Sequence, residues 1–598
     1  MNFEFKNNFV GYFKFYYRIL GNKMLLYLML STFISLLDGI GLAMFIPLLQ
    51  SVSSAGSDAS GNASLGQLHY ITDFIQYLGF ELNVVTVISF LLSIFLFKGI
   101  MKYVQLSYSA MLREVFLKKV RFSLINNLQG ISYTAFLKLD SGKIQNGLTT
   151  EVTRLFLTMT SYFTAAQSFM MLLTYIVLAF LANFQFALLV AFGSMLSNVI
   201  YKKINTRTRR LSGEISKKAN DFNGYLIQSV NHFKYLKSTN TFSAYGQKMR
   251  AVINSSEKLN RKIGKLRAIA VSIKEPLIIS IVSMVILIQV QLFGSSLSSI
   301  ILSLLLFYRS LSFLVSVQNE WQNFIENIGG LQSVSKLQMN MAALQEPVGH
   351  TMLPKIEKSI KFKDVSFSYG HKQIFEGMNI RIPVKQTIAL IGESGSGKTT
   401  IANMITGLLT PTGGQVLVDD VPLSELNLSH YRSKIGYISQ EPVVFNDTVF
   451  NNITFWAEPT AENKKRFEEV LELALLKDFV NGLPEKDQTI LGDNGILISG
   501  GQKQRISIAR ELFKNVEVLI LDEATSALDS ETEKTIQENI ENLHGSYTMI
   551  LIAHRLSTIR QADIIYLLEE GKVTASGSFD EMINSSTRFQ KMVSLQAI

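Results

Sequence analysis

The sequence predicts an α-helical membrane domain followed by a soluble α/β domain. Two observations lead to this fold class. The first half of the 598-residue chain holds long runs of Leu, Ile, Phe, Val and Met. The second half alternates short apolar strands with polar helices, and one of these strands runs into a glycine-rich loop that precedes a helical pattern. The chain has no cysteine, which excludes disulfides and thiolate metal sites.

Six apolar stretches are long enough, or nearly so, to cross a bilayer, which takes about 20 residues in a helix. They are residues 24–49, 84–103, 161–182, 184–201, 276–293 and 298–317. The connections at 51–83, around 183 and at 294–297 contain no Lys or Arg, whereas the other connections are rich in both. The positive-inside rule therefore places both termini in the cytoplasm, and we expect a multi-pass protein of a bacterial inner membrane.

Two long connections, at about 104–160 and 202–275, have helical character and few prolines. We expect helices that extend well beyond the membrane, with turns near 133–140 and 228–235. The N-terminal stretch does not read as a signal peptide, because Lys6, Lys14 and Arg18 interrupt its aromatic residues and no small-residue cleavage site follows. Aromatic and basic residues together indicate a helix lying in the inner membrane interface.

The membrane domain is predicted to span residues 1–333, followed by a linker at 334–358 and the soluble domain at 359–598. In the soluble domain the strand at 387–391 runs into Gly-x4-Gly-Lys-Thr and then a helix, which is the context of a phosphate-binding loop. A chance glycine-rich turn is the alternative, and the complete spacing argues against it. In such a loop Lys398 reaches the β- and γ-phosphate oxygens and Thr399 holds Mg²⁺. The nucleotide-binding residues expected here are Gly392, Glu393, Ser394, Gly395, Ser396, Gly397, Lys398, Thr399 and Thr400.

Two further apolar strands end in residues that suit phosphate chemistry. Asp522 ends one of them, where a carboxylate can hold Mg²⁺ through water. Glu523 follows directly and would polarise the attacking water. His554, at the end of "YTMILIAH", can contact the γ-phosphate as a neutral imidazole. A solvated acidic turn and a structural histidine are the alternatives, and the phosphate loop upstream favours function.

The segment Ile-Ser-Gly-Gly-Gln at 498–502 has the features of a helix start. Ser499 suits the N-cap position, and the small Gly500 and Gly501 leave backbone N–H groups bare. The N-terminus of a helix of this kind binds an anion.

On these motifs, residues 356–598 resemble the nucleotide-binding domain of ATP-binding cassette (ABC) transporters, a P-loop ATPase domain. In that family the segment 498–502, which here ends in Gln502, faces the γ-phosphate held by the phosphate loop of another copy. The resemblance implies ATP and Mg²⁺ as cofactors and a homodimer with two equivalent sites. It also assigns Tyr369 to stacking on adenine, Gln440 to contact with Mg²⁺, and Asp529, in the loop 526–529, to the partner contact. The six-span half resembles an exporter half-transporter, in which ATP hydrolysis drives translocation.

Asp38, Lys98 and Arg309 lie inside the first, second and sixth predicted spans. An ionisable group at membrane depth costs a few kcal/mol, so it should face the bundle interior or a partner. Two interpretations are possible for these residues. Asp38 could pair with Lys98 or Arg309, or the residues could contact a substrate. If Lys98 and Arg309 are unpaired in the cavity, they favour an anionic substrate such as a phospholipid head or a lipid pyrophosphate.

The substrate class draws on a narrower resemblance. "LLDGIGLAMFIPLL" resembles the first span of flippases of lipid-linked oligosaccharides, and a helix expected within 51–83 resembles their external helix. A loop packed against the neighbouring spans is the alternative for that segment. We therefore expect an ATP-driven exporter or flippase that moves an amphipathic, lipid or lipid-linked substrate from the inner to the outer side by alternating access, with membrane lipids as further partners.

Other functions are compatible with parts of this sequence. Peptide and multidrug exporters share the same plan. An ATP-gated channel or regulator is a remoter alternative, because such relatives usually have degenerate sites and this one is complete. The formal charge of +10 raises the possibility of nucleic acid, but the basic residues cluster next to apolar runs, so we expect no nucleic-acid partner.

Overall fold

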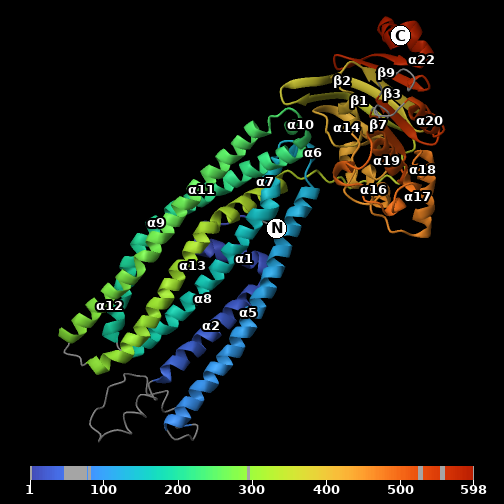
Figure 1. Cartoon of the computed structure of the whole chain (residues 1–598). Coiled ribbons are helices and arrows are strands. Elements are labelled where there is room, and N and C mark those ends of the chain that lie inside the picture. Colours follow the sequence, from blue (N-terminus) through green and yellow to red (C-terminus); the bar gives the residue numbers. More distant parts are fainter. Residues whose placement is uncertain are drawn as a thin grey trace. The chain divides into compact units, whose positions relative to one another are not determined.

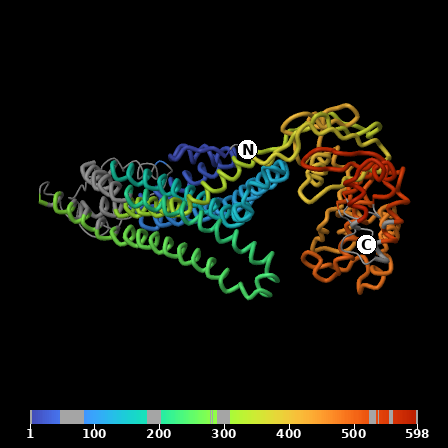
Figure 2. The backbone as a smooth tube through the Cα atoms, turned by 90° about the horizontal axis from the view of Figure 1, so that it is seen from above, coloured from blue at the N-terminus to red at the C-terminus, as the bar shows by residue number. Residues whose placement is uncertain are grey.

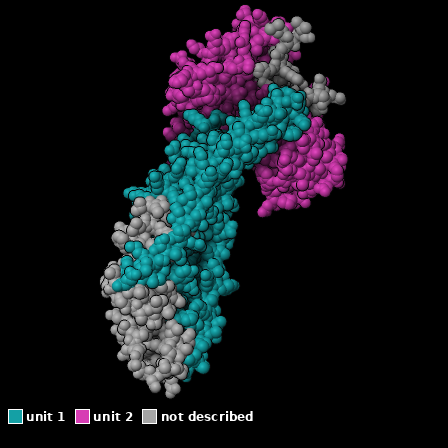
Figure 3. Space-filling view, turned by 60° about the vertical axis from the view of Figure 1, so that its left-hand side comes forward, with its two compact units in different colours: residues 1–131, 135–345 teal, residues 132–134, 346–598 magenta. Residues whose placement is uncertain are grey.

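The computed structural model of the chain describes residues 3–45, 77, 83–182, 184–291, 297–522, 530–552 and 559–596. The chain forms two compact units, coloured separately in Figure 3. The first comprises Met1–Ile131 and Ala135–Gln345, and the second comprises Ser132–Thr134 and Glu346–Ile598. Helices make up the first unit, and the named strands all belong to the second. The predicted fold class, a helical domain followed by an α/β domain, is confirmed.

The first unit is built from long helices, of which α5, α9 and α13 have 46, 48 and 47 residues (Figure 1). The long elements are α1 (Phe9–Leu20), α2 (Asn22–Ala43), α5 (Val84–Gln129), α8 (Val152–Ala182), α9 (Phe184–Asn231), α11 (Phe242–Ser272), α12 (Lys274–Gln291) and α13 (Leu297–Ala343). The short elements are α7 (Ser141–Asn146), the π-helical turn η2 (Gly147–Glu151) and α10 (Phe233–Ser238). The short helix α6 (Tyr133–Phe136) has its first two residues grouped with the second unit.

The helix α13 packs along both α8 and α9, and α11 runs beside α9 (Figures 1 and 2). Two adjacent glycines permit this double contact. A Cβ at Gly329 would lie 2.5 Å from the carbonyl oxygen of Ser212 in α9. A Cβ at Gly330 would lie 2.5 Å from Cβ of Arg154 in α8. The backbone of α13 can therefore approach both neighbours only because these two positions lack side chains.

Three segments among the described residues are long and apolar enough to cross a membrane, namely Asn22–Ala43, Val84–Gln129 and Ser141–Phe180. The other three predicted spans fall on α9, α12 and α13, whose side chains lie partly outside the described residues. The predicted turns are found where α5 gives way to α6 and where α9 gives way to α10. Of the segment 51–83, which carries the predicted external helix, only residues 77 and 83 are described.

The segment predicted as a linker begins as a helix. The helix α13 continues to Ala343, because the stretch "VSKLQMNMAA" consists largely of good helix formers and contains no Gly or Pro. The first strand, β1, then begins at Ser359.

Two sheets form the framework of the second unit. A four-stranded sheet has the order β2-β1-β4-β5, and a six-stranded sheet has the order β10-β9-β3-β8-β7-β6. In the larger sheet every neighbouring pair is parallel except β9 and β10. The strands are β1 (Ser359–Tyr369), β2 (Lys372–Pro383), β3 (Thr387–Gly392), β4 (Gly413–Val418), β5 (Val421–Pro422), β6 (Ile435–Ile438), β7 (Val518–Asp522), β8 (Thr548–Ile552), β9 (Ile564–Glu569) and β10 (Lys572–Gly577).

Helices of the second unit surround the larger sheet (Figure 1). The α-helices are α14 (Lys398–Ile405), α15 (Leu428–Arg432), α16 (Val449–Thr454), α17 (Ala461–Leu473), α18 (Lys477–Asn481), α19 (Gly500–Phe513), α20 (Ser530–Glu541), α22 (Phe579–Ser585) and α23 (Thr587–Gln596). Single 3-10 turns are η3 (Leu423–Glu425), η4 (Lys486–Gln488) and η5 (Asp493–Gly495).

The larger sheet is buried on both faces, which explains why its central strands are continuously apolar. Alternate residues of β3 enter two different cores. Ala389 and Ile391 pack with residues of α16, α17 and α19. Ile388 and Leu390 pack with α14 and with the four-stranded sheet. The sheet is therefore held rigidly, and its strand ends are fixed points on which a site can be built.

Candidate functional site

A glycine-rich loop joins the end of β3 to the start of α14. Gly392 ends β3 with a φ of +150°, and a Cβ there would lie 2.2 Å from the carbonyl oxygen of Leu568. Gly397 is the N-cap of α14 with a φ of +103°, and a Cβ there would lie 2.2 Å from the ring of Phe375. Both positions require glycine. The loop thus leads straight into a helix N-terminus, whose unpaired N–H groups and dipole favour an anion.

The Lys398 side chain lies within this loop and is only 6% exposed. Its Nζ atom donates to the carbonyl oxygens of Gly392, at 2.9 Å, and of Glu393, at 3.0 Å. The Ser396 hydroxyl is also buried and has no hydrogen-bond partner among the described residues. A buried hydroxyl without a partner is costly, and a phosphate oxygen would supply the missing acceptor. The residues of this loop therefore fit a bound polyphosphate.

The strands β3, β8, β7 and β6 are adjacent and parallel, so their C-terminal ends lie along one edge of the sheet. Asp522 ends β7 at this edge. From β6, the Tyr437 hydroxyl donates to Asp522 Oδ2 at 3.0 Å. Burial, and then the charge of Asp522, raises the pKa of Tyr437, so its hydroxyl keeps its proton and remains a donor at neutral pH. This hydrogen bond orients the Asp522 carboxylate.

The donors expected for Mg²⁺ are a carboxylate at Asp522, a hydroxyl at Thr399 in α14 and an amide oxygen at Gln440 just after β6. Mg²⁺ prefers hard oxygen ligands and is usually held by one or two protein groups together with substrate phosphates. This donor set therefore fits the ion.

Three predicted site residues, Glu523, His554 and Asp529, lie outside the residues that the structure describes. The structure does describe the ends of β7 and β8, the strands that precede Glu523 and His554 in the sequence. Asp522 at the end of β7 pairs with Ile552 at the end of β8. The strands β7 and β8, which precede these two residues in the sequence, are therefore adjacent and end at the sheet edge that carries the phosphate loop.

Tyr369 and the 498–502 segment lie on other elements of the second unit. Tyr369 ends β1, is 43% exposed and meets the Phe367 ring edge-on with centroids 4.8 Å apart. Ser499 is the N-cap of α19, as predicted. It forms a capping box, in which its hydroxyl accepts from the N–H of Gln502 at 3.3 Å while Gln502 Oε1 accepts from the N–H of Ser499 at 2.9 Å. Ser499 and Gly500 are exposed, so this helix end is open to a ligand.

Sequence reasoning missed two residues of this site. Tyr437 is 85 positions from Asp522 in the chain, and only the pairing of β6 with β7 brings them together. Arg588, on α23, forms ion pairs with Glu393 of the phosphate loop and, at 3.3 Å, with Glu569. No spacing rule links either residue to the loop, so nothing in the sequence could have identified them.

The predicted turn after α5 contributes to the second unit. Ser132–Thr134 groups with that unit, and Tyr133 packs against its core cluster. Tyr133 is also close enough to Tyr437 to influence its hydroxyl electrostatically. A residue from the helical half of the sequence thus packs against the core of the second unit.

The ionisable residues predicted inside the spans are partly paired. Asp38 on α2 forms an ion pair with Lys98 on α5, and it accepts a hydrogen bond from the Tyr175 hydroxyl on α8 at 2.8 Å. Of the two alternatives for Asp38 and Lys98, the structure thus shows the pairing. Arg309 on α13 is exposed, and no carboxylate among the described residues lies within ion-pair distance of it.

The comparisons with known proteins agree with this geometry. The sequence model of the family described as "ABC transporter" matches residues 375–526. An "ATP-dependent lipid A-core flippase" of Cupriavidus metallidurans is 33% identical over 424 residues, which cover 68% of this chain and 69% of that protein. The "Heterocyst differentiation ATP-binding protein HepA" of Nostoc is 30% identical over 488 residues, 79% of this chain and 78% of that protein.

A solved structure has the same fold over nearly the whole chain. The "Structure of a bacterial Atm1-family ABC exporter with ATP bound" superposes with a TM-score of 0.81, covers 97% of this chain and 100% of that chain, and is 19% identical in sequence.

Proposed function

Because the chain belongs to the ABC transporters, we propose that it is an ATP-driven flippase that moves an anionic, amphipathic lipid or lipid-linked molecule across the membrane. The observation that carries this proposal is the phosphate loop at one end of β3, with the orphaned Ser396 hydroxyl and the oriented Asp522 carboxylate at the same sheet edge. Apolar helices long enough to span a membrane stand in the same chain. ATP hydrolysis in the second unit therefore drives translocation through the first.

Nucleotide binding is assigned to Tyr369, the loop from Gly392 to Thr400, and Gln440. We expect Lys398 to leave the carbonyl oxygens of Gly392 and Glu393 and to bind phosphate oxygens instead. A hydrogen bond between two charged groups is stronger than one from a charged donor to a neutral carbonyl oxygen. Ser396 would gain an acceptor, which no described residue provides. Tyr369 offers a half-exposed aromatic face to the adenine.

The hydrolytic step is assigned to Asp522, Glu523 and His554. Thr399, Gln440 and Asp522 would hold Mg²⁺, which neutralises charge on the phosphates when it is bound. Glu523 would accept a proton from the attacking water, and neutral His554 would orient it. Tyr437 donates to the Asp522 carboxylate and so keeps this expected Mg²⁺ ligand in place.

A homodimer with two shared sites completes the proposal. The start of α19, from Ser499 to Gln502, whose first two residues are exposed, would bind the γ-phosphate held by the partner's loop, and Asp529 would contact the partner. ATP binds the closed dimer more tightly than the open one, and this difference in affinity is what can drive the spans from inward to outward opening.

The substrate assignment is supported by the relatives and by one charge. The curated relatives that match most of the chain include several named as lipid A-core flippases. Arg309 is the predicted substrate residue that remains a cation without a carboxylate partner in the described part of the chain, whereas Lys98 and Asp38 neutralise each other. We therefore assign the anionic head of the substrate to Arg309. Both termini would be cytoplasmic in a bacterial inner membrane, with transport toward the outer side.

Reconstitution in proteoliposomes tests the proposal. The wild-type protein should accelerate the appearance of a fluorescent lipid with an anionic phosphate head in the opposite leaflet when ATP is added, and Glu523→Gln should bind ATP but slow this at least about 100-fold. Arg309→Ala should reduce transport of the anionic lipid while basal hydrolysis continues. Transport of peptides but of no lipid would replace the proposed substrate class, and ATP-independent equilibration of ions would indicate a channel.

A further inference from the structure

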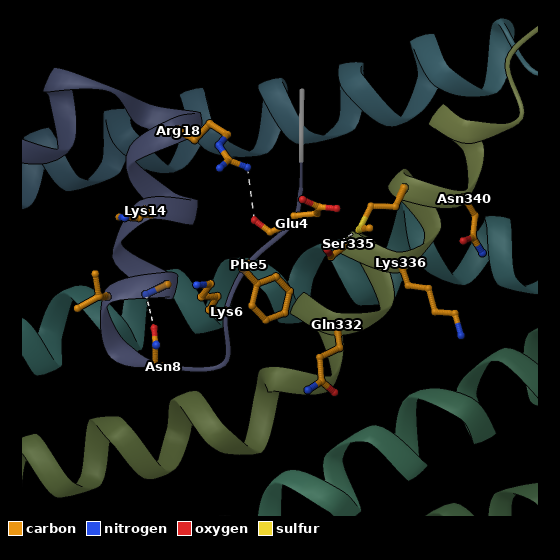
Figure 4. A pocket seen from close by; sticks show the side chains of 13 residues that line it. Glu4, Phe5, Lys6, Asn8, Lys14, Arg18, Gln332, Ser335, Lys336 and Asn340 are labelled. Carbon is orange, nitrogen blue, oxygen red and sulfur yellow. Dashed lines mark hydrogen bonds between the residues drawn. The ribbon is translucent and has the colours of Figure 1, made fainter.

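A pocket lined by several basic side chains lies in the first unit, away from Asp38, Lys98 and Arg309. It has a volume of about 770 Å³ and lies between the N-terminal segment, α1 and the C-terminal part of α13 (Figure 4). The extended residues before α1 form one wall. They are held in place because the buried Ser335 hydroxyl on α13 donates to the carbonyl oxygen of Phe3 at 2.5 Å. The Phe3 and Phe5 rings both meet the Phe15 ring edge-on, with centroids 5.8 Å apart. The pocket is thus built by ordered packing.

The lining of this pocket is strongly basic. It contains Lys6, Lys14, Arg18 and Lys336, against the single carboxylate of Glu4. The side chains come from two helical stripes with i, i+4 spacing, in which residues 10, 14 and 18 of α1 stand opposite residues 332, 336 and 340 of α13. The amides Gln332 and Asn340 flank Lys336 on the second stripe (Figure 4). Such a lining offers cations and amide donors to an anion that has several oxygen atoms.

The helix α1 has the composition of an interfacial helix. Its inner face buries Tyr12, Phe15 and Tyr16, whereas Phe9 and Val10 are 51% and 59% exposed. The membrane-spanning candidate α2 begins at Asn22, directly after Gly21. A helix that exposes apolar and basic residues next to the start of a span lies at the level of the lipid headgroups. Anionic lipids at that level are attracted by clusters of Lys and Arg.

From these observations we propose that this pocket binds the phosphate of an anionic membrane lipid, at a site separate from the path of the transported substrate. The lipid phosphate lies among Lys6, Lys14, Arg18 and Lys336, and its acyl chains lie toward the exposed apolar residues of α1. This site goes beyond the proposed flippase activity. A lipid that contacts both α1 and α13 would tie the N-terminal segment to the helix that leads into the second unit.

Native mass spectrometry of the detergent-solubilised, full-length protein tests the proposal without ATP or transport. The protein is titrated with phosphatidylglycerol, phosphatidylcholine and the soluble anion glycerol 3-phosphate. Each basic residue near an anionic headgroup contributes roughly a factor of five, so Lys14→Gln combined with Lys336→Gln should weaken phosphatidylglycerol binding about 25-fold. The matched control is Lys23→Gln, which removes an exposed lysine at the start of α2 that does not line the pocket.

Two further variants separate charge from misfolding. Lys14→Arg combined with Lys336→Arg keeps both charges and should retain phosphatidylglycerol binding. The double variant with two Gln substitutions and the double variant with two Arg substitutions should also have the same apparent Tm in the absence of lipid. Equal phosphatidylglycerol affinity in the Gln pair and the wild type would overturn the site. Phosphatidylcholine that binds as tightly as phosphatidylglycerol would overturn its preference for anionic lipids, and glycerol 3-phosphate that binds as tightly would overturn the assignment to a lipid.

Discussion

The Tyr437 hydroxyl donates a hydrogen bond that orients the Asp522 carboxylate, and this hydroxyl can be removed without removing the ring. A hydrogen bond to a charged group is worth about 1.5–3 kcal/mol. If Asp522 holds Mg²⁺, Tyr437→Phe should raise the Mg²⁺ concentration needed for half-maximal ATP hydrolysis roughly tenfold. A titration of ATPase activity with Mg²⁺ at saturating ATP measures this shift.

The control for this variant is another buried tyrosine of the same unit. The Tyr431 hydroxyl donates to the carbonyl oxygen of Ile405 at 2.9 Å and contacts no predicted Mg²⁺ ligand in the described residues. Tyr431→Phe should therefore reduce stability but leave the Mg²⁺ concentration needed for half-maximal ATP hydrolysis unchanged. If the two variants shift the titration equally, Tyr437 has no specific role at Asp522.

Glu326 on α13 predicts a pH dependence of stability. Burial raises its pKa above the usual 4.5, and the opposing effects of Arg267 and Gln322 are smaller. The folded state therefore binds more protons than the unfolded state as the pH rises past 4.5, and stability falls through that interval until the folded carboxyl has ionised. Glu326→Gln should remove this fall, so its apparent Tm should exceed that of the wild type by a margin that grows as the pH rises above about 5, until the folded carboxyl has ionised.

Thermal unfolding of the solubilised protein across that pH range measures the effect. Glu257→Gln, at an exposed position of α11, is the matched control and should follow the wild-type pH profile. Parallel profiles for Glu326→Gln and the wild type would show that the buried carboxylate does not limit stability.

At the scale of elements, the packing of α13 against α8 depends on Gly330. A Cβ at this position would lie 2.5 Å from Cβ of Arg154 and 2.9 Å from the backbone nitrogen of Leu155. The positions of both atoms are fixed by the backbone of α8, so the two helices must separate. Overpacking of this kind costs about 1–3 kcal/mol, and Gly330→Ala should lower the apparent Tm. The same separation would disturb Arg154, which donates to Ser216 at 2.6 Å and to Ser212 at 2.9 Å on α9.

Gly264 on α11 provides the opposite case. It is also a helical glycine, but a Cβ there would meet nothing within 4 Å. Gly264→Ala should stabilise the protein by about 0.5–1 kcal/mol, because alanine loses less backbone entropy in a helix. Opposite signs of the change in apparent Tm for the two substitutions would locate the effect in the helix contact. Two shifts of the same sign would mean that glycine propensity, and not packing, determines both.

The same elements show which features a sequence can reveal. The phosphate loop and the capped start of α19 were predictable because their residues are contiguous and their chemistry is local, as the capping box of Ser499 and Gln502 shows. The contacts of Gly330, the ion pair of Arg588 with Glu393, and the choice of Lys98 as the partner of Asp38 join distant segments. These contacts depend on tertiary packing, and the periodic patterns of a single sequence do not indicate which distant segments pack together.

For the whole molecule, a chain that carries one phosphate loop and one exposed α19 start can complete a site in two ways. The two motifs could meet within one chain, or each could meet its counterpart on a second copy. A C₂ dimer of the second kind contains two equivalent sites, each built from both chains. Two inactivating substitutions distinguish the two arrangements. They can be placed one in each chain of a dimer or both in the same chain, and the two arrangements predict opposite activities for these two dimers.

Lys398→Ala disables the phosphate loop, and Ser499→Arg blocks the start of α19 with bulk and charge. Co-expression with two affinity tags allows defined dimers to be purified. A dimer of one Lys398→Ala chain and one Ser499→Arg chain retains one intact shared site, so it should hydrolyse ATP at about half the wild-type rate if the sites act independently. A dimer of the doubly substituted chain with a wild-type chain has no intact shared site and should be inactive. Because both dimers carry the same two substitutions, the reverse pattern would mean that each chain completes its own site.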